Sequence, residues 1–323
     1  MPARAFAALL QGLAWTIFAI GTAAQDYPNR PLKLIQGFPP GGNADVVARI
    51  LGQEMSKGLG QPILVEARPG AGGSIAAEAV AKAAPDGYTL LLVTGGHAVA
   101  GASYKSLAYH SVDSFAMIST ATFFPFVIAT RTDGKYRSLP ALLQAARAAP
   151  ESVILGAAGP GVTQHLTGEL LASMAGVKFL YVPYKGDAAA VTALLGDQTS
   201  FIIAPATAVL PHVKSGAFRV LAATGPNRWP GMPEVPTVDE IAVRGFDVRS
   251  WIGLATTAGT PQPIVERLHA ETQRALQAPA VRERLEQIGG EVRGSTPEEM
   301  RARVAVEVQR WSQLIRDAKL EQQ

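Results

Sequence analysis

The chain has no cysteine, few charged residues and no cluster of basic residues. Without cysteine it cannot form a disulfide, a thiolate zinc site, an iron–sulfur cluster or a catalytic thiol. Only 17% of its 323 residues are charged, with 29 lysines and arginines against 26 aspartates and glutamates. Nucleic-acid binding needs lysine and arginine gathered on one face, so we expect no nucleic-acid partner.

Sequence patterns for metals, nucleotides and hydrolytic triads are also missing. The five histidines are scattered, and none is paired at the four-residue spacing that places two imidazoles on one helical face. There is no phosphate-binding loop, and the glycine-rich turn at 159–161 lacks the later glycine of a dinucleotide fingerprint. No serine lies in a Gly-x-Ser-x-Gly elbow. We therefore expect no metal, no cofactor and no catalytic residues.

One apolar segment stands out, at the N terminus. Residues 5–20 are mainly apolar, follow Arg4 and precede small residues at 22–24, and no acidic residue is present. The stretch is shorter than the about 20 apolar residues of a spanning helix and is interrupted by a glutamine and a glycine. This pattern is typical of a secretory signal peptide over residues 1–24. An uncleaved membrane anchor is the alternative.

From Tyr27 onward, short β-type runs alternate with helical stretches, which predicts an α/β fold with parallel sheets covered by helices. The first unit has predicted strands at 32–38, 63–66 and 89–93, and predicted helices at 44–59 and 74–83. The second unit has predicted helices at 141–148, 163–175 and 188–195, and predicted strands at 153–156, 178–183, 201–204 and 219–223.

The segments that join the two units are less regular. Residues 115–130 form a long apolar β-like run that contains Pro125, so we expect this run to split or to cross between domains there. Residues 225–236 hold four prolines and are predicted to be the return connection. A strand at 250–256 and helices at 261–277, 280–288 and 296–320 complete the prediction. The charges of the last helix are interpreted as a solvated face.

Two glycine-rich turns have the same arrangement, in which a strand ends in glycines and a helix opens. The first spans residues 39–45 and the second spans residues 159–163. The first N–H groups of a helix lack intrahelical partners, and the positive end of its dipole favours anions. Each unit therefore offers half of an anion site, and two domains facing each other would hold both ends of a dianion.

Each candidate residue also has a purely structural interpretation. Asn43 is suited to capping a helix, and Asp45 and Arg49 to forming a surface ion pair. His165 fits a hydrogen-bonded interior position, and the turn at 185–187 fits a simple charged turn.

The order of short motifs resembles one known family, the extracytoplasmic solute-binding proteins of tripartite tricarboxylate transporters, called Bug receptors. The matching motifs extend along nearly the whole mature chain. They are Tyr27-Pro28-x-x-Pro31, Phe38-Pro39-Pro40-Gly41-Gly42-x-x-Asp45, Glu66-x-Arg68-Pro69-Gly70-Ala71-Gly72-Gly73, Pro85-Asp86-Gly87-Tyr88, Gly159-x-Gly161, His165-Leu166, Val182-Pro183-Tyr184-Lys185-Gly186, Val235-Pro236-Thr237, Trp251-x-Gly253 and Ala258-Gly259-Thr260-Pro261.

The resemblance implies an α/β, two-domain periplasmic binding protein of the Venus flytrap, type II-like kind, with two crossover strands and no enzymatic activity. It implies one lobe of residues 25–124 plus 225–323 and a second lobe of residues 125–224. The implied partners are a small carboxylate and the large and small membrane subunits of the transporter, with the receptor itself a monomer in the periplasm of a Gram-negative cell.

The resemblance also implies the ligand contacts. In the first lobe these are Phe38, Gly42, Asn43 and Ala44, with Asp45 holding the loop. In the second lobe they are Gly159, Gly161, Val162, Thr163, Lys185, Gly186 and Asp187. The chain departs from the family at Val162, where serine is common, so one hydroxyl donor is lost while the backbone N–H remains.

Two alternatives to transport stay open. A binding subunit that reports its ligand to a membrane sensor protein has the same fold and cleft, so only the partner distinguishes it. An exported α/β enzyme needs a nucleophile, a base or a metal in the cleft, and His165 and Asp187 are too few to name a reaction.

Overall fold

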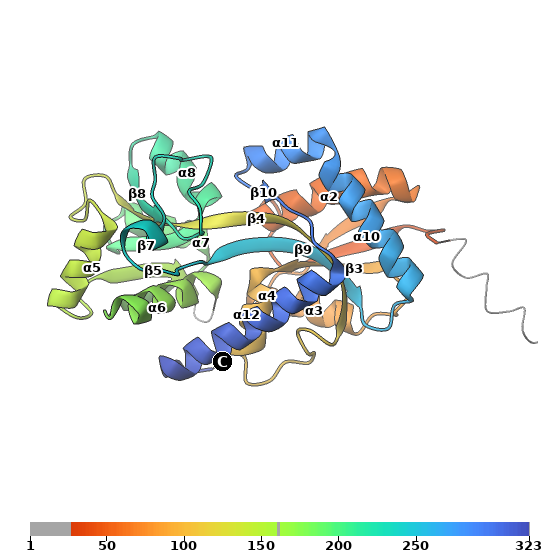
Figure 1. Cartoon of the computed structure of the whole chain (residues 1–323), viewed down its shortest axis with the longest axis horizontal. Coiled ribbons are helices and arrows are strands. Elements are labelled where there is room, and N and C mark those ends of the chain that lie inside the picture. The colour runs from red at the N-terminus through yellow and green to blue at the C-terminus, as the bar shows by residue number, and fades with distance from the viewer. Residues whose placement is uncertain (1–26, 160–161, 323) are drawn as a thin grey trace, which may run out of the picture.

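The computed structural model describes residues 27–159 and 162–322 of the chain (Figure 1). The signal peptide predicted over residues 1–24 lies outside the described residues. Within those two ranges, no helix is long and apolar enough to cross a membrane.

The strands of the described residues form one sheet with the order β2-β1-β3-β9-β4-β7-β5-β6, and β10 and β8 also pair with β4. Their bounds are β1 (Leu32–Gln36), β2 (Ile63–Ala67), β3 (Thr89–Thr94), β4 (Phe115–Arg131), β5 (Ile154–Ala158), β6 (Leu180–Tyr184), β7 (Phe201–Pro205), β8 (Phe218–Ala223), β9 (Arg249–Thr257) and β10 (Glu291–Val292). Strands β1, β2 and β3 pair in parallel, as do β5, β6 and β7, so the predicted α/β class is confirmed.

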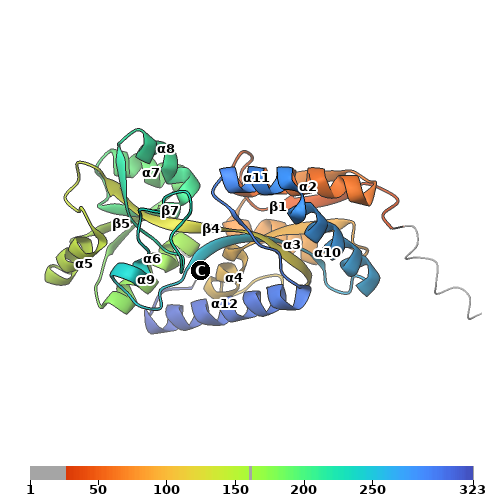
Figure 2. The same ribbon diagram turned by 45° about the horizontal axis from the view of Figure 1, so that its top comes forward.

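Helices cover the sheet. They are α2 (Asn43–Leu59), the 3-10 helix η1 (Ala71–Gly73), α3 (Ser74–Ala81), α4 (Gly95–Ser103), α5 (Leu139–Ala148), α6 (Thr163–Ala175), α7 (Asp187–Leu195), α8 (Ala206–Lys214), α9 (Val238–Ile241), α10 (Gln262–Gln277), α11 (Pro279–Gln287) and α12 (Pro297–Asp317). We call β1, β2 and β3 the first group of strands and β5, β6 and β7 the second group. Figure 2 shows α2, α10 and α11 on one side of the first group and α4 and α12 on the other.

Strand β4 runs through the whole molecule without a break. As far as Pro125 it pairs with β9, and from Phe126 it pairs with β7, while β8 joins at Val127. The run therefore does not split at Pro125. A proline has no N–H to donate to a ladder, and its position where β4 exchanges its partners is a place where a lost donor is tolerated.

Alternation along the strands builds a core on both faces of the sheet. Leu32 and Leu34 of β1 belong to a buried cluster with α2 and α10, whereas Ile35 belongs to the cluster on the α3 and α4 side. The cluster on the α3 and α4 side, which contains Ile35, continues through Trp311 of α12 to Leu166 of α6. Helix α12 therefore lies at the junction between the two groups of strands, where it packs on α4, β4 and α6.

Several elements were not predicted from the sequence: helices α4 and α8, the short helix α9, the 3-10 helix η1 and strand β10. Helix α4 starts with Gly95 and Gly96, and α8 contains Pro211, and glycine and proline are the weakest helix formers. Tertiary packing overrides these preferences, since α4 lies against α12 and α8 lies against β4. The proline-rich segment 225–236 contains no helix or strand, as expected.

Candidate functional site

The carboxyl ends of the two groups of parallel strands face each other across the middle of β4 (Figure 1). Thr94 ends β3 and pairs with Ile252, which pairs in turn with Thr122 of β4. Pro205 ends β7 and pairs with Phe126 of β4. Phe126 lies four residue steps along the strand from Thr122, a distance of about 14 Å. The turns that follow β1, β2 and β3, here named the first half-site, therefore face the turns that follow β5 and β6, named the second half-site.

A buried acid holds the turn between β1 and α2. Gly41 has a φ of 81°, and its N–H donates to Asp45 Oδ2 at 3.1 Å. Arg49 donates from Nε to the same oxygen at 2.9 Å and from a terminal nitrogen to Oδ1 at 3.1 Å. The Arg49 hydrogen bond is the main reason that the pKa of Asp45 is lowered, and the Gly41 N–H adds to it. Asp45 is 4% exposed, whereas the Arg49 side chain is 58% exposed, so the ion pair joins a buried acid to a base at the surface. In addition to this pair, Asp45 braces the turn through Gly41.

Helix α2 begins without a side-chain cap. Gly42 is the N-cap and Asn43 is already helical, so the interpretation of Asn43 as the N-cap is wrong. No side chain accepts a hydrogen bond from the first N–H groups, which stay available to a ligand. Gly42 is exposed, Asn43 is half-buried and Ala44 is buried. The half-buried ring of Phe38 completes this turn.

Close backbone contacts join the turn after β1 to two further turns. A Cβ on Gly37 would lie 2.4 Å from the Cα of Gly73, so only glycine allows these two segments to touch. A Cβ on Gly96, at the start of α4, would lie 3.4 Å from the carbonyl oxygen of Gly72. The turns after β2 and β3 were not predicted as parts of the site. Their signal in the sequence is the glycine content of residues 70–73 and 95–96.

The second half-site begins where β5 leads into α6. Gly159 has a φ of 79°, and the Tyr181 hydroxyl donates to its carbonyl oxygen. Val162 is the N-cap of α6 and offers no side-chain acceptor, while Thr163 is the first helical residue and is buried. The predicted contact Gly161 lies outside the described residues.

His165 belongs to the support of this half-site. Its ring stacks on Tyr181 with the ring centroids 3.9 Å apart, and its Nε2 lies 3.5 Å from Glu169 Oε1. It is 9% exposed, as an interior histidine would be. Because Tyr181 holds Gly159, His165 supports the turn through this tyrosine.

A side-chain hydrogen bond connects α6 to α7. Gln164, the second residue of α6, donates from Nε2 to Asp187 Oδ1 at 2.9 Å. Asp187 is the first residue of α7, and the N-cap Gly186 has a φ of 93° and no side-chain cap. Burial raises the pKa of Asp187 to about 6, and the Gln164 hydrogen bond only partly opposes this shift. Lys185 and Gly186 are exposed.

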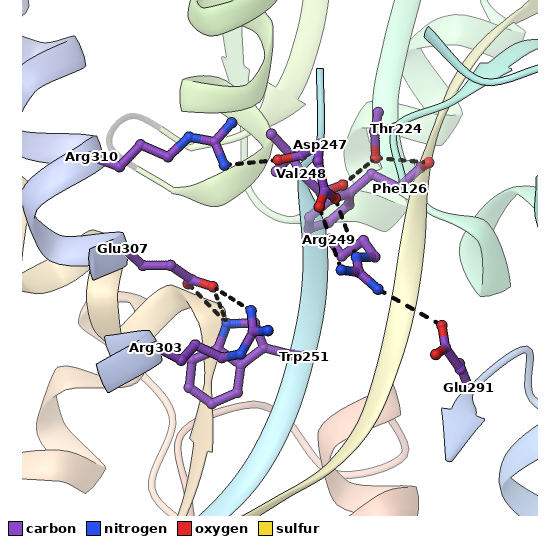
Figure 3. A network of polar contacts seen from close by, with 10 residues as sticks. All are labelled: Phe126, Thr224, Asp247, Val248, Arg249, Trp251, Glu291, Arg303, Glu307 and Arg310. Carbon is purple, nitrogen blue, oxygen red and sulfur yellow. Dashed lines mark hydrogen bonds and ion pairs between the residues drawn. The ribbon is translucent and has the colours of Figure 1, made fainter. Parts of the chain in front are cut away.

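A polar network fastens the two crossing segments where β4 changes partners (Figure 3). The buried Thr224 hydroxyl donates to the carbonyl oxygens of Val248 at 2.6 Å and Phe126 at 3.1 Å. Arg249, the first residue of β9, lies 3.2 Å from Asp247 and 3.8 Å from Glu291. The network keeps β4 and β9 together between the half-sites.

The inner face of α12 carries charges that do not lie in solvent. The Glu307 carboxylate accepts the Trp251 indole N–H at 2.8 and 2.9 Å and lies 3.1 Å from Arg303 (Figure 3). Burial raises the pKa of Glu307, while Trp251 and Arg303 oppose this shift. The expectation of a solvated face is therefore wrong for these residues, since Trp251 is fully buried against α12. A Cβ on Gly95 would lie 3.3 Å from the indole nitrogen, so Trp251 also supports the start of α4.

Within residues 27–159 and 162–322, no group of three or more His, Asp or Glu side chains is arranged to hold a metal ion. The site in these ranges consists of helix starts, glycine backbone and one half-buried acid. This arrangement can bind an anion through N–H groups.

The chain matches known proteins over most of its length. The model of the family described as "Tripartite tricarboxylate transporter family receptor" matches residues 47–320. Protein BugT of Bordetella pertussis is 36% identical over 301 residues, which are 93% of this chain and 92% of BugT.

Two solved structures of Rhodopseudomonas palustris proteins have the same fold. Rpa4515 with adipate is 32% identical, with a TM-score of 0.82 over 91% of this chain and 99% of that one. MatC (Rpa3494) with bound malate is 32% identical, with a TM-score of 0.79 over 90% of this chain and 100% of that one.

Proposed function

Because the chain belongs to the tripartite tricarboxylate transporter receptor family and is a solute-binding protein of that family and not an enzyme, we propose that it captures a small carboxylate in the periplasm. We further propose that it delivers this ligand to the large and small membrane subunits of a tripartite transporter. The adipate and malate bound by the two similar structures support a carboxylate ligand. The apolar N-terminal segment supports export.

The observation that carries this proposal is the meeting of uncapped helix starts across the middle of β4. Helices α2, α6 and α7 begin at Gly42, Val162 and Gly186, none of which provides a side-chain cap. Elsewhere in the described chain, Ser138, Thr237 and Thr296 cap α5, α9 and α12, whereas α3, α4, α8, α10 and α11 also begin without a side-chain cap. The feature that distinguishes the site is therefore that three uncapped starts meet across β4. Uncapped N–H groups and the positive ends of helix dipoles favour a carboxylate.

The energetics are sufficient without an arginine in the site. A hydrogen bond to a charged group contributes about 1.5–3 kcal/mol. Several such bonds, shared between two carboxylates, offset the about 4–15 kcal/mol lost on association. We propose as contacts the residues expected from the sequence, which are Phe38, Gly42, Asn43, Ala44, Gly159, Gly161, Val162, Thr163, Lys185, Gly186 and Asp187, with Asp45 bracing the first turn.

We also propose two lobes that close on the ligand, with residues 25–124 and the C-terminal segment in one and the middle of the chain in the other. The change of strand partners at Pro125 supports the first boundary. Helix α9 lies against α5, which supports a second boundary close to Arg249 in place of residue 225. Each lobe then holds half of the donors, so ligand binding favours closure and a smaller radius of gyration in small-angle scattering.

Calorimetry on the mature chain from residue 25 tests the carboxylate site. Gly42 has an ordinary φ of −76°, so Gly42→Leu can fold while its side chain blocks the start of α2. We expect this variant to lose at least about tenfold in affinity for the tightest of succinate, malate, adipate and citrate. Gly196→Leu, at the exposed end of α7 and with a φ of −82°, is the matched control. Equal affinity in both variants removes the first half-site from the proposal.

Transport is tested separately. Co-expression of the chain with the membrane subunits of a tripartite transporter should produce uptake of the bound carboxylate, and the Gly42→Leu variant should reduce it. Binding in calorimetry without uptake with any such pair would favour the sensor-subunit alternative.

A further inference from the structure

The second half-site contains an acidic side chain, Asp187, although a negative charge repels a carboxylate ligand. Asp187 is the first residue of α7, directly after Gly186, which is one of the proposed contacts. Its hydrogen bond from Gln164 brings it beside the start of α6. The Asp187 carboxylate therefore lies among the donors that would bind a ligand carboxylate, and its negative charge opposes that ligand.

The described part of the chain leaves the acceptor capacity of Asp187 largely unused. An ionised carboxylate can accept about four hydrogen bonds, and in these residues Gln164 is its one hydrogen-bond donor. No described basic side chain forms an ion pair with it, although Lys185 is only two residues away. Burial accordingly raises its pKa to about 6, with no nearby positive charge to oppose the shift. Asp187 is half-buried, and acids withdrawn from water are normally paired with a cation or several donors.

Stabilisation of α7 by its dipole does not account for an aspartate at position 187. An aspartate in the first turn of a helix gains from the dipole when it is exposed and ionised, and its pKa then falls. Asp187 is half-buried instead, its carboxylate faces Gln164 of α6, and burial raises its pKa. The Gln164 amide orients the carboxylate toward the start of α6, where the ligand is proposed to lie.

We propose that Asp187 is a specificity-determining residue that accepts a hydrogen bond from the ligand, so that the protein prefers a carboxylate carrying an ammonium or hydroxyl group over the unsubstituted acid. This inference rests on the proposed carboxylate site. Helix starts bind the carboxylates, and the donor group of the ligand supplies the partner that Asp187 lacks. An ammonium group gains more than a hydroxyl group because its charge also offsets that of Asp187.

Calorimetry with matched ligand series tests the assignment. Each series keeps the carbon chain and changes one substituent: succinate, malate and aspartate; glutarate, 2-hydroxyglutarate and glutamate; adipate and 2-aminoadipate. In the best-fitting series we expect the substituted acid to bind at least about tenfold more tightly than its parent. The hydroxyl and ammonium arms show which donor the site prefers.

The variant Asp187→Asn removes the charge and keeps an oxygen that can accept from Gln164. We expect it to bind the unsubstituted acid about tenfold more tightly than the wild type does and to reduce the preference for the substituted acid to about threefold or less. Asp197→Asn is the matched control, because Asp197 is an exposed acid beyond the other end of α7. We expect it to leave every affinity unchanged.

The outcomes separate this inference from the function on which it rests. Equal binding of parent and substituted acids by the wild type, with no change in Asp187→Asn, overturns the role of Asp187 and leaves the carboxylate site in place. Binding of the unsubstituted acid only in Asp187→Asn supports the role. Failure of every acid to bind either protein rejects the carboxylate site and this inference with it.

Discussion

The two half-sites each contain an aspartate near the start of a helix, and the two acids behave in opposite ways. Asp45 accepts hydrogen bonds from Gly41 and Arg49, and its pKa is lowered. Asp187 accepts from Gln164, and its pKa is raised. The difference lies in which effect is larger: burial dominates at Asp187, where only the Gln164 hydrogen bond opposes it, whereas the Arg49 hydrogen bond outweighs desolvation at Asp45.

This difference separates an acid that serves the fold from an acid that serves a ligand. A fully paired buried carboxylate stabilises the turn that it holds, and its removal leaves buried donors without acceptors. A half-buried carboxylate with one hydrogen-bond donor lowers stability at neutral pH, and such destabilising groups are common at functional sites. Opposite effects on stability are therefore expected when the two residues are replaced.

The largest effect is expected for Asp45→Ala. The change leaves the Gly41 N–H and the fully buried Gln36 amide without their acceptor. We expect a loss of about 2–4 kcal/mol in the free energy of unfolding, measured by urea denaturation. Asp133 forms a similar fork with Arg131 but its side chain is 71% exposed, so Asp133→Ala should cost at most about 1 kcal/mol. Equal losses in the two variants would show that Asp45 is no more structural than a surface acid.

A smaller effect, of opposite sign, is expected for Asp187→Asn. The folded-state pKa of about 6 lies above the usual value of 3.8, so the native protein binds the proton more tightly and wild-type stability falls as pH rises from about 4 through 6. This shift corresponds to about 3 kcal/mol at most, which partial exposure reduces to about 1–2 kcal/mol. We therefore expect Asp187→Asn to be more stable than the wild type at pH 8, with a smaller gain at pH 4.

The control for this prediction is again the pH profile of Asp197→Asn, which should follow that of the wild type. If Asp187→Asn is less stable than the wild type at pH 8, then Asp187 has partners that stabilise its ionised form, and the contrast with Asp45 disappears.

The sequence predicts most of the order of strands and helices, but it predicts few of the side-chain contacts between them. The order of most strands and helices follows from hydrophobic alternation and from glycines and prolines at the turns. The prediction missed helices α4 and α8, which tertiary packing sustains, and the short elements α9, η1 and β10. The Trp251–Glu307 contact joins residues 56 positions apart in a geometry that no local pattern encodes. For the same reason Glu307 was expected in solvent.

In the candidate site, too, the local features were predictable and the long-range contacts were not. The uncapped helix starts at Gly42 and Val162 follow from glycine-rich turns after strands, so their positions were predictable. The contact between Gly37 and Gly73 was not, because it depends on how two parallel strands place their following turns. The contrast between Asp45 and Asp187 was equally hidden, since burial and partners determine the pKa of an acid and the sequence shows only the residue type.

The smallest effect is expected for Lys185→Ala. This variant tests whether the positive charge of Lys185 neutralises Asp187 or contributes to ligand binding. Lys185 lies two residues before Asp187 but is exposed, and no described acid pairs with it. An exposed charge is screened by water and salt, so it can neither neutralise Asp187 nor dominate ligand binding. We expect Lys185→Ala to change the calorimetric affinity for any carboxylate by less than about threefold. A loss of tenfold or more would mean that Lys185 moves onto the ligand on closure, and the second half-site would then bind anions through a lysine and not mainly through the starts of α6 and α7.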